Sequence, residues 1–146
     1  MNDPVKYLVN YLNSPTINSN EKIQLNKFLN AFLCRLNDFI YTYKLHHSNC
    51  LSLNRWFLLT DMNLSNIQLK LMPNENVFSN LPNLQRLWLC NNQIETLNNC
   101  LIKCYSLIEL RLNSNQLHSI HKQLYKLHCL EILDLSLNHL SNLLVS

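Results

Sequence analysis

The stretch LQRLWLCNNQI, residues 84–94, occurs twice more in altered form, as LIELRLNSNQL at residues 107–117 and as LEILDLSLNHL at residues 130–140. Each copy begins 23 residues after the one before it. All three have leucine at the first, fourth and sixth positions, asparagine at the ninth, and leucine or isoleucine at the eleventh. Self-similarity at a fixed period is the signature of a repeat architecture, so the second half of the chain is predicted to be built from repeated units.

A fourth, degenerate copy lies upstream. Residues 59–69, LTDMNLSNIQL, fit the same frame at a spacing of 25 residues, with Met62 in place of a leucine and Ile67 in place of the asparagine. We therefore expect two sections. Residues 1–58 form a helical N-terminal section or cap, and residues 59–146 hold units that start at 59, 84, 107 and 130, the last of them incomplete.

Within each unit the leucines alternate with polar residues, which predicts a short strand with one apolar face. A single unit cannot bury that face, whereas at least three stacked units bury a continuous apolar core beside a parallel sheet. The asparagines are expected to bond to backbone groups where the chain leaves each strand, because a buried unpaired group costs about 1–3 kcal/mol. This structural ladder consists of Asn92, Asn115 and Asn138.

The LxxLxLxxNxL pattern resembles that of the leucine-rich repeat family, and the resemblance covers about residues 59–146. It implies an α/β leucine-rich repeat solenoid with short parallel strands on its concave side. In that family the side chains between the strand leucines point outward from the concave face, which is the usual ligand surface. Carried over to this sequence, the partner-binding residues are Asp61, Asn63, Arg86, Trp88, Cys90, Glu109, Arg111, Asn113, Ile132 and Asp134.

The expected neighbours of Arg111 on this face are Trp88 and Asp134, since adjacent strands lie about 4.8 Å apart. A cation–π contact with Trp88 and an ion pair with Asp134 are both feasible. Trp and Arg dominate the binding energy of many interfaces, so Trp88 and Arg111 are the expected hot spot. The alternative is that Trp88 only shields the sheet, because single exposed apolar residues are normal.

The first 58 residues lack the repeat. Asp3-Pro4 predicts the start of a short helix that ends near Asn13. A longer helix is expected after a cap at Asn18 or Ser19, and its apolar stripe contains the following residues at spacings of three and four: Leu25, Leu29, Phe32, Leu36, Phe39 and Tyr43. This helix is interpreted as a cap over the first unit, and the alternative is a partner-binding or coiled-coil helix.

Composition narrows the classes of function. The chain has 146 residues, no glycine and a formal net charge of +3. Glycine-rich nucleotide-binding loops and EF-hand turns are therefore excluded. Lys and Arg are scattered, so no nucleic-acid partner is expected. A third interpretation is a nucleic-acid site at Tyr41, Tyr43, Lys44, His46 and His47. We expect a cytoplasmic protein with no membrane partner, because no signal peptide or apolar span is recognised, and six free cysteines.

No metal, cofactor or enzymatic activity is expected. His46 and His47 with Cys50, and His118 with His121, have spacings that a metal could use, but neither set provides four converging ligands. Cys90 lies on the concave face without a neighbouring histidine, so the catalytic residues of a thiol enzyme are missing.

The sequence thus predicts a non-catalytic protein–protein interaction module that binds another protein on the concave face. The alternative is a regulatory or targeting segment of a larger multidomain enzyme, since modules of this family are often joined to catalytic domains. The last unit lacks the counterparts of Leu124 and Leu127, and no polar cap follows. An open end exposes its leucines, so the chain is expected to be a fragment of a longer repeat protein or to self-associate end to end.

Overall fold

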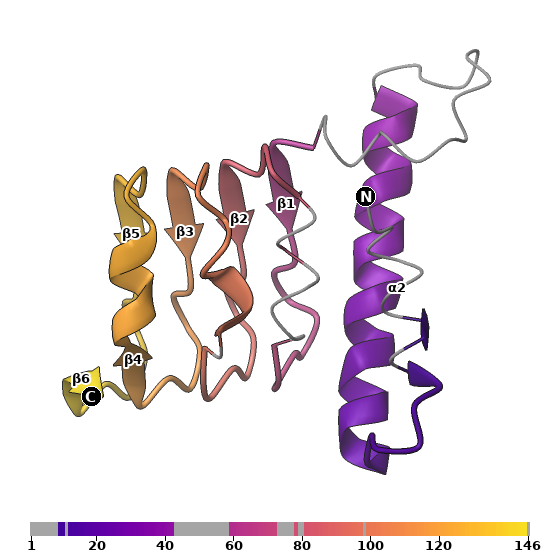
Figure 1. Ribbon diagram of the computed structural model, residues 1–146, viewed down its shortest axis with the longest axis horizontal. Coiled ribbons are helices and arrows are strands. Elements are labelled where there is room, and N and C mark those ends of the chain that lie inside the picture. The colour runs from indigo at the N-terminus through magenta and orange to yellow at the C-terminus, as the bar shows by residue number, and fades with distance from the viewer. Residues whose placement is uncertain are drawn as a thin grey trace.

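The computed structural model describes residues 9–10, 12–42, 59–72, 78, 81–97 and 99–145 of the chain. The described part is mixed α/β and consists of one long helix beside a parallel sheet (Figure 1). The long helix is α2, Ser19–Thr42. The sheet has four strands, which are β1 (Asp61–Asn63), β2 (Arg86–Trp88), β3 (Glu109–Arg111) and β5 (Ile132–Asp134). Two short 3-10 helices, η3 (Asn99–Leu101) and η4 (Lys122–Lys126), lie on the return segments.

The four strands pair in the order β1, β2, β3, β5, and every pair is parallel. The middle residues Met62, Leu87, Leu110 and Leu133 are partners across the sheet. Equivalent positions of the sequence repeat are therefore aligned without a shift. The expected class, α/β with short parallel strands, is confirmed at this level.

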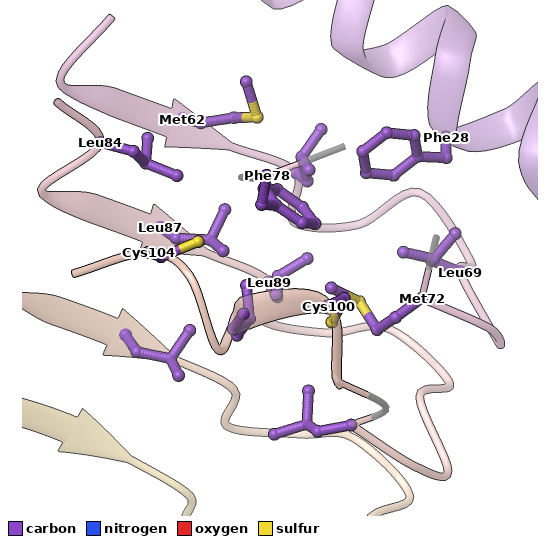
Figure 2. Packing of buried hydrophobic residues seen from close by; sticks show 14 of the residues in the cluster. Phe28, Met62, Leu69, Met72, Phe78, Leu84, Leu87, Leu89, Cys100 and Cys104 are labelled. Atoms are coloured by element: carbon purple, nitrogen blue, oxygen red, sulfur yellow. The ribbon is translucent and has the colours of Figure 1, made fainter. Parts of the chain in front are cut away.

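The repeat leucines form the core. Leu84, Leu87 and Leu89 are buried, and so are their counterparts Leu107, Leu110 and Leu112. Figure 2 shows Met62, Leu84, Leu87 and Leu89 directed into one cluster. Burial of a leucine side chain contributes about 1.5–3 kcal/mol relative to an exposed one, so this cluster supplies much of the stability.

The three ladder asparagines bond to the backbone of the unit before them. Asn115 Oδ1 accepts a hydrogen bond from the Ile94 amide at 3.0 Å, and its Nδ2 donates to the carbonyls of Leu89 and Leu112, both at 2.9 Å. Asn92 and Asn138 make the same kinds of bonds in their own units. Each amide group thus satisfies donors and acceptors that the sheet leaves unpaired.

The chain turns through left-handed backbone without any glycine. Asn66 (φ 62°), Asn91 (φ 53°), Gln68 (φ 56°), Ser114 (φ 57°) and Leu137 (φ 55°) adopt this conformation. Asparagine tolerates it better than most residues, which explains the first two. The other three, Gln68, Ser114 and Leu137, are residue types without this tolerance. Asparagine therefore accounts for only some of the left-handed positions at which other proteins often have glycine.

Helix α2 begins with a capping box, which confirms the predicted start. The Asn18 side chain accepts a hydrogen bond from the Glu21 amide at 2.9 Å, and the Glu21 carboxylate accepts one from the Asn18 amide at 3.2 Å. Reciprocal bonds of this kind satisfy two of the amides that a helix N-terminus leaves free.

Helix α2 lies on the side of β1 away from β2 (Figure 1). Four of its apolar residues belong to the core cluster, namely Leu25, Phe28, Leu29 and Phe32. Phe28 stacks on Phe32, with ring centroids 5.7 Å apart. It also makes an edge contact with Phe78 at the same centroid distance (Figure 2). The Lys70 amide also donates to Gln24 Oε1 at 2.8 Å. The helix therefore covers this end of the core. Val9, Asn10 and Leu12 are helical, and the rest of the predicted short helix, with Tyr43, lies outside the described residues.

A second, smaller sheet runs beside the return segments. Strand β4 (Ser119–His121) pairs in parallel with β6 (Asn142–Val145), and Leu71 forms an isolated parallel bridge with Thr96. These strands were not predicted from the sequence. Their positions recur at the repeat period, so a search for extended segments after each asparagine could have found them.

Candidate partner-binding face

One face of the four-stranded sheet holds the residues that the sequence singled out. One row of this face contains Asp61, Arg86, Glu109 and Ile132, which occupy equivalent positions on adjacent strands. A second row contains Asn63, Trp88, Arg111 and Asp134 in the same register. Cys90 and Asn113 come two residues after Trp88 and Arg111, respectively. We call these ten residues the sheet face.

The N-terminal part of the sheet face is held by an ion pair. The Arg86 guanidinium bonds to both carboxylate oxygens of Asp61, with Nη2 to Oδ2 at 2.9 Å. The Thr60 hydroxyl donates to the same carboxylate at 3.0 Å. Arg86 lowers the pKa of Asp61 most, and partial burial opposes this effect before the smaller contribution from Thr60. These two hydrogen bonds fix the orientation of the Arg86 side chain toward Asp61 on the neighbouring strand.

Glu109 is the centre of the sheet face. Its Oε1 accepts a hydrogen bond from Arg111 Nε at 2.5 Å and another from Trp88 Nε1 at 3.0 Å. The hydrogen bond from Arg111 lowers the pKa of Glu109 most, followed by that from Trp88, while burial acts in the opposite direction. One carboxylate thus positions an indole and a guanidinium from two neighbouring strands.

These contacts correct the predicted arrangement in two respects. Glu109 was expected to face a partner, but its exposed fraction is 9% because Trp88 and Arg111 bond over it. An ion pair with Asp134 and a cation–π contact with Trp88 were both feasible for Arg111, but Arg111 and Trp88 instead both donate to Glu109. The carboxylate of Glu109, on the same strand as Arg111, lies closer to the guanidinium than the carboxylate of Asp134 on the next strand.

Asp134 is instead bound by its own turn. Its Oδ1 accepts the Ser136 hydroxyl at 2.7 Å and the Ser136 amide at 3.0 Å. These bonds lower the pKa of Asp134 most, and the nearby charge of Arg111 adds to the effect. Asp134 therefore carries a negative charge at neutral pH and influences Arg111 only through space.

The remaining positions lie where the strands end. The Cys90 amide donates to the Ser65 hydroxyl at 3.1 Å, and the Cys90 thiol lies 3.9 Å from the Arg111 carbonyl. Cys90 and Asn113 are half-buried, whereas Asn63, Arg86, Arg111 and Ile132 are exposed. The groups that the sheet face offers to a partner are therefore two guanidinium groups, one amide, one aliphatic side chain and the half-buried Trp88.

The cysteines of the return segments belong to the core. Cys100 and Cys104 are buried among the repeat leucines (Figure 2). Burial raises the pKa of the Cys104 thiol to about 12 and that of Cys100 as well. Both are protonated at neutral pH, so they act as small apolar residues. Cys34, Cys90 and Cys129 are also free thiols, and Cys50 lies outside the described residues.

Within the part of the chain that the structure describes, no three His, Cys, Asp or Glu side chains gather closely enough to hold a metal ion. The ring of His118 lies beside that of His139, with centroids 5.8 Å apart. His46, His47 and Cys50 lie outside the described residues, as do Lys44 and Tyr43 of the third interpretation.

Comparison with protein-family models finds no matching family, and comparison with the curated proteins finds no significant match. The helix found in the described residues is not long and apolar enough to cross a membrane.

Proposed function

We propose that this chain is a leucine-rich repeat solenoid and acts as a non-catalytic protein–protein interaction module, with the sheet face as its partner-binding surface. The 23-residue period, the parallel register and the bonded asparagine ladder support the repeat architecture. The residues of the sheet face alternate with the buried leucines along each strand, so they lie on the opposite face of the sheet from the core.

The observation that carries the proposal is the Trp88–Glu109–Arg111 cluster. Trp and Arg are the side chains most enriched among interface hot spots. Here both are held on one carboxylate oxygen before any partner arrives. A side chain already held in place loses less entropy on binding, and immobilising a mobile one costs about 0.5–1.5 kcal/mol. The cluster thus supplies two preorganised contacts.

The cluster also favours a protein partner over a small molecule. Arg111 uses one of its five N–H donors on Glu109, and its side chain remains 45% exposed on the sheet face. Carbonyl and carboxylate groups of a partner surface can accept these hydrogen bonds while apolar side chains cover Trp88 and Ile132. Such a mixture of aromatic, aliphatic and arginine contacts is typical of protein interfaces.

The test is affinity capture with the whole chain, comparing wild type with a Trp88→Ala/Arg111→Glu double variant. We expect proteins captured by the wild type to be lost with this variant, because charge reversal opposes electrostatic complementarity. A Lys103→Ala/Lys126→Ala variant is the matched control on the return segments and should capture as the wild type does. Circular dichroism verifies that all variants are folded.

The same captures also distinguish the sheet face from the helix. Ile23 is an exposed apolar residue of α2, so Ile23→Glu alters the helix surface without removing core contacts. If the partner is retained by Trp88→Ala/Arg111→Glu and lost with Ile23→Glu, the helix is the binding element and the proposal is wrong.

A further inference from the structure

The outer edge of β5 has no strand beside it within the described residues. The Ile132 amide donates to the Ile108 carbonyl at 3.0 Å, and the Asp134 carbonyl accepts from the Leu112 amide at 2.8 Å, so both groups point toward β3. Along a strand these groups alternate in direction. The amide and carbonyl of Leu133 therefore point away from β3, where an inner strand would bond to its neighbour.

The same edge exposes apolar side chains. Met62, Leu87 and Leu110 have exposed fractions of 2%, 0% and 0%, whereas Leu133, at the equivalent position, is 42% exposed. Ile132 is 45% and Leu137 is 78% exposed. We call Ile132, Leu133 and Leu137 the β5 edge. An exposed edge strand with apolar side chains readily pairs with another strand.

Leu137 adds an independent observation. It has a φ of 55° at the position where the two preceding units have Asn91 and Ser114. A leucine in left-handed backbone is conformationally unfavourable, whereas asparagine tolerates this conformation. The side chain also gains no burial within the chain. Neither backbone conformation nor intrachain packing accounts for leucine at this position, but contact with another molecule does.

We propose that the β5 edge is a self-association surface that joins two copies of this chain around a two-fold axis. The opposite end of the sheet is covered, because α2 lies beside β1 (Figure 1) and its Phe28 and Phe32 are buried in the core. A head-to-tail contact between the β5 edge and β1 of another copy is therefore blocked. The remaining contact joins like edges, which gives a closed dimer rather than a fibre.

The charges of β5 favour an axis at Leu133 over one at Asp134. With the axis at Leu133, an antiparallel pair places Leu133 opposite the partner's Leu133, Ile132 opposite the partner's Asp134, and Glu131 opposite the partner's Leu135. No like charges then lie directly opposite each other. Sliding the strands so that the axis lies at Asp134 would place two carboxylates face to face, which destabilises a pair of strands.

The strands and side chains involved form a small surface. Small transient interfaces bury less than about 1,200 Å² in total, so we expect a weak dimer with a dissociation constant in the micromolar range. Sedimentation velocity of the whole chain, from about 1 to about 200 μM, should therefore show the dimer fraction rise with concentration.

Two variants test the surface. Leu133→Lys places a charge at the edge and should raise the dissociation constant by about tenfold or more, as lysine does on natural edge strands. Leu137→Asn introduces the residue type of Asn91, at the equivalent position two units earlier, so it should weaken the dimer without lowering the unfolding midpoint. Tyr105→Lys, at an exposed aromatic residue away from the edge, is the matched control and should leave the dissociation constant unchanged.

Cross-linking tests the register. In a background with Cys34, Cys90 and Cys129 changed to serine, Leu133→Cys should form a disulfide-linked dimer under mild oxidation. Residues opposite each other in a bonded antiparallel pair have Cα atoms about 5.5 Å apart, within the range a disulfide spans. Ile132→Cys should not cross-link, because its copies lie two residues apart along the strands.

A chain that remains monomeric up to about 200 μM would overturn the proposal and leave the β5 edge to a strand of a different protein. Growth beyond the dimer would overturn the two-fold arrangement. Dimerisation that Leu133→Lys and Leu137→Asn leave unchanged would place the contact elsewhere on the molecule.

Discussion

The amide side chain of Asn115 shows how a single residue can be essential to a repeat. It is buried, it accepts from the backbone of one unit, and it donates to carbonyls of that unit and of its own. An apolar side chain of similar size would fill the space but leave the Ile94 amide without its acceptor, and it would remove one of the two asparagine donors from the carbonyls of Leu89 and Leu112. The position therefore demands an amide for its hydrogen bonds and not for its volume.

Asn115→Leu should destabilise the fold by about 1–3 kcal/mol, the usual cost of an unsatisfied buried polar group. Urea unfolding measures the change, and Asn113→Ala, two residues away on the sheet face, is the control that should be almost silent. Equal shifts in the two urea midpoints would contradict the assigned register of the repeat.

The ionisation of Glu109 is expected to make the stability of the fold depend on pH. Its pKa is lowered in the folded protein by Arg111 and Trp88, so its contribution to stability is present above the unfolded pKa of about 4.3 and is lost as pH falls through the folded value. Glu109→Gln should therefore be less stable than wild type at pH 7, and the difference should shrink below about pH 4.

Urea midpoints measured at several pH values between neutral and acidic conditions check this expectation. Glu95→Gln, which removes a carboxylate from an exposed position, is the matched control. A difference between wild type and Glu109→Gln that stays constant down to strongly acidic pH would show that Glu109 is not held as an ionised acceptor.

At the scale of elements, α2 completes the core that the first unit leaves open. Phe28→Ala should cost about 3–5 kcal/mol, because the ring is fully buried against Phe32 and Phe78. Thermal unfolding measures the loss, and Ile23→Ala on the exposed side of the helix should change the midpoint little. A small effect of Phe28→Ala would mean that the helix does not contribute to the cooperative core.

The elements also show what the sequence could predict. Leucine spacing was sufficient to locate the strands, because burial of every second residue dictates their register. The capping box of α2 was recognisable because Asn18 and Glu21 have the required spacing. Strands β4 and β6 were missed because they depend on pairing between units, for which the local pattern of three or four residues carries little signal.

The sheet face was predictable in position but not in its contacts. Alternation along each strand identifies which side chains point outward. It does not decide whether Arg111 bonds to Asp134 on the next strand or to Glu109 on its own, since both carboxylates are within reach of a long side chain. The choice depends on side-chain geometry and on Trp88, which competes for the same oxygen.

The whole molecule is asymmetric along its sheet (Figure 1). At one end α2 covers Met62 and its neighbours, and at the other Leu133 is partly exposed. The ladder asparagines also become more exposed toward the β5 end of the sheet, since Asn92 and Asn115 are buried whereas Asn138 is half-buried. The sheet face between the two ends depends on the ladder, because those asparagines fix how neighbouring strands align.

Hydrogen exchange of asparagine side-chain amides, followed by nuclear magnetic resonance, tests this dependence most directly. The amides of Asn92 and Asn115 should exchange much more slowly than those of exposed residues such as Asn13 and Asn26, because the first two are buried and bonded to backbone carbonyls. Asn138, which is half-buried, should be intermediate. Exchange of Asn92 and Asn115 as fast as that of Asn13 would contradict the asparagine ladder and the sheet face built on it.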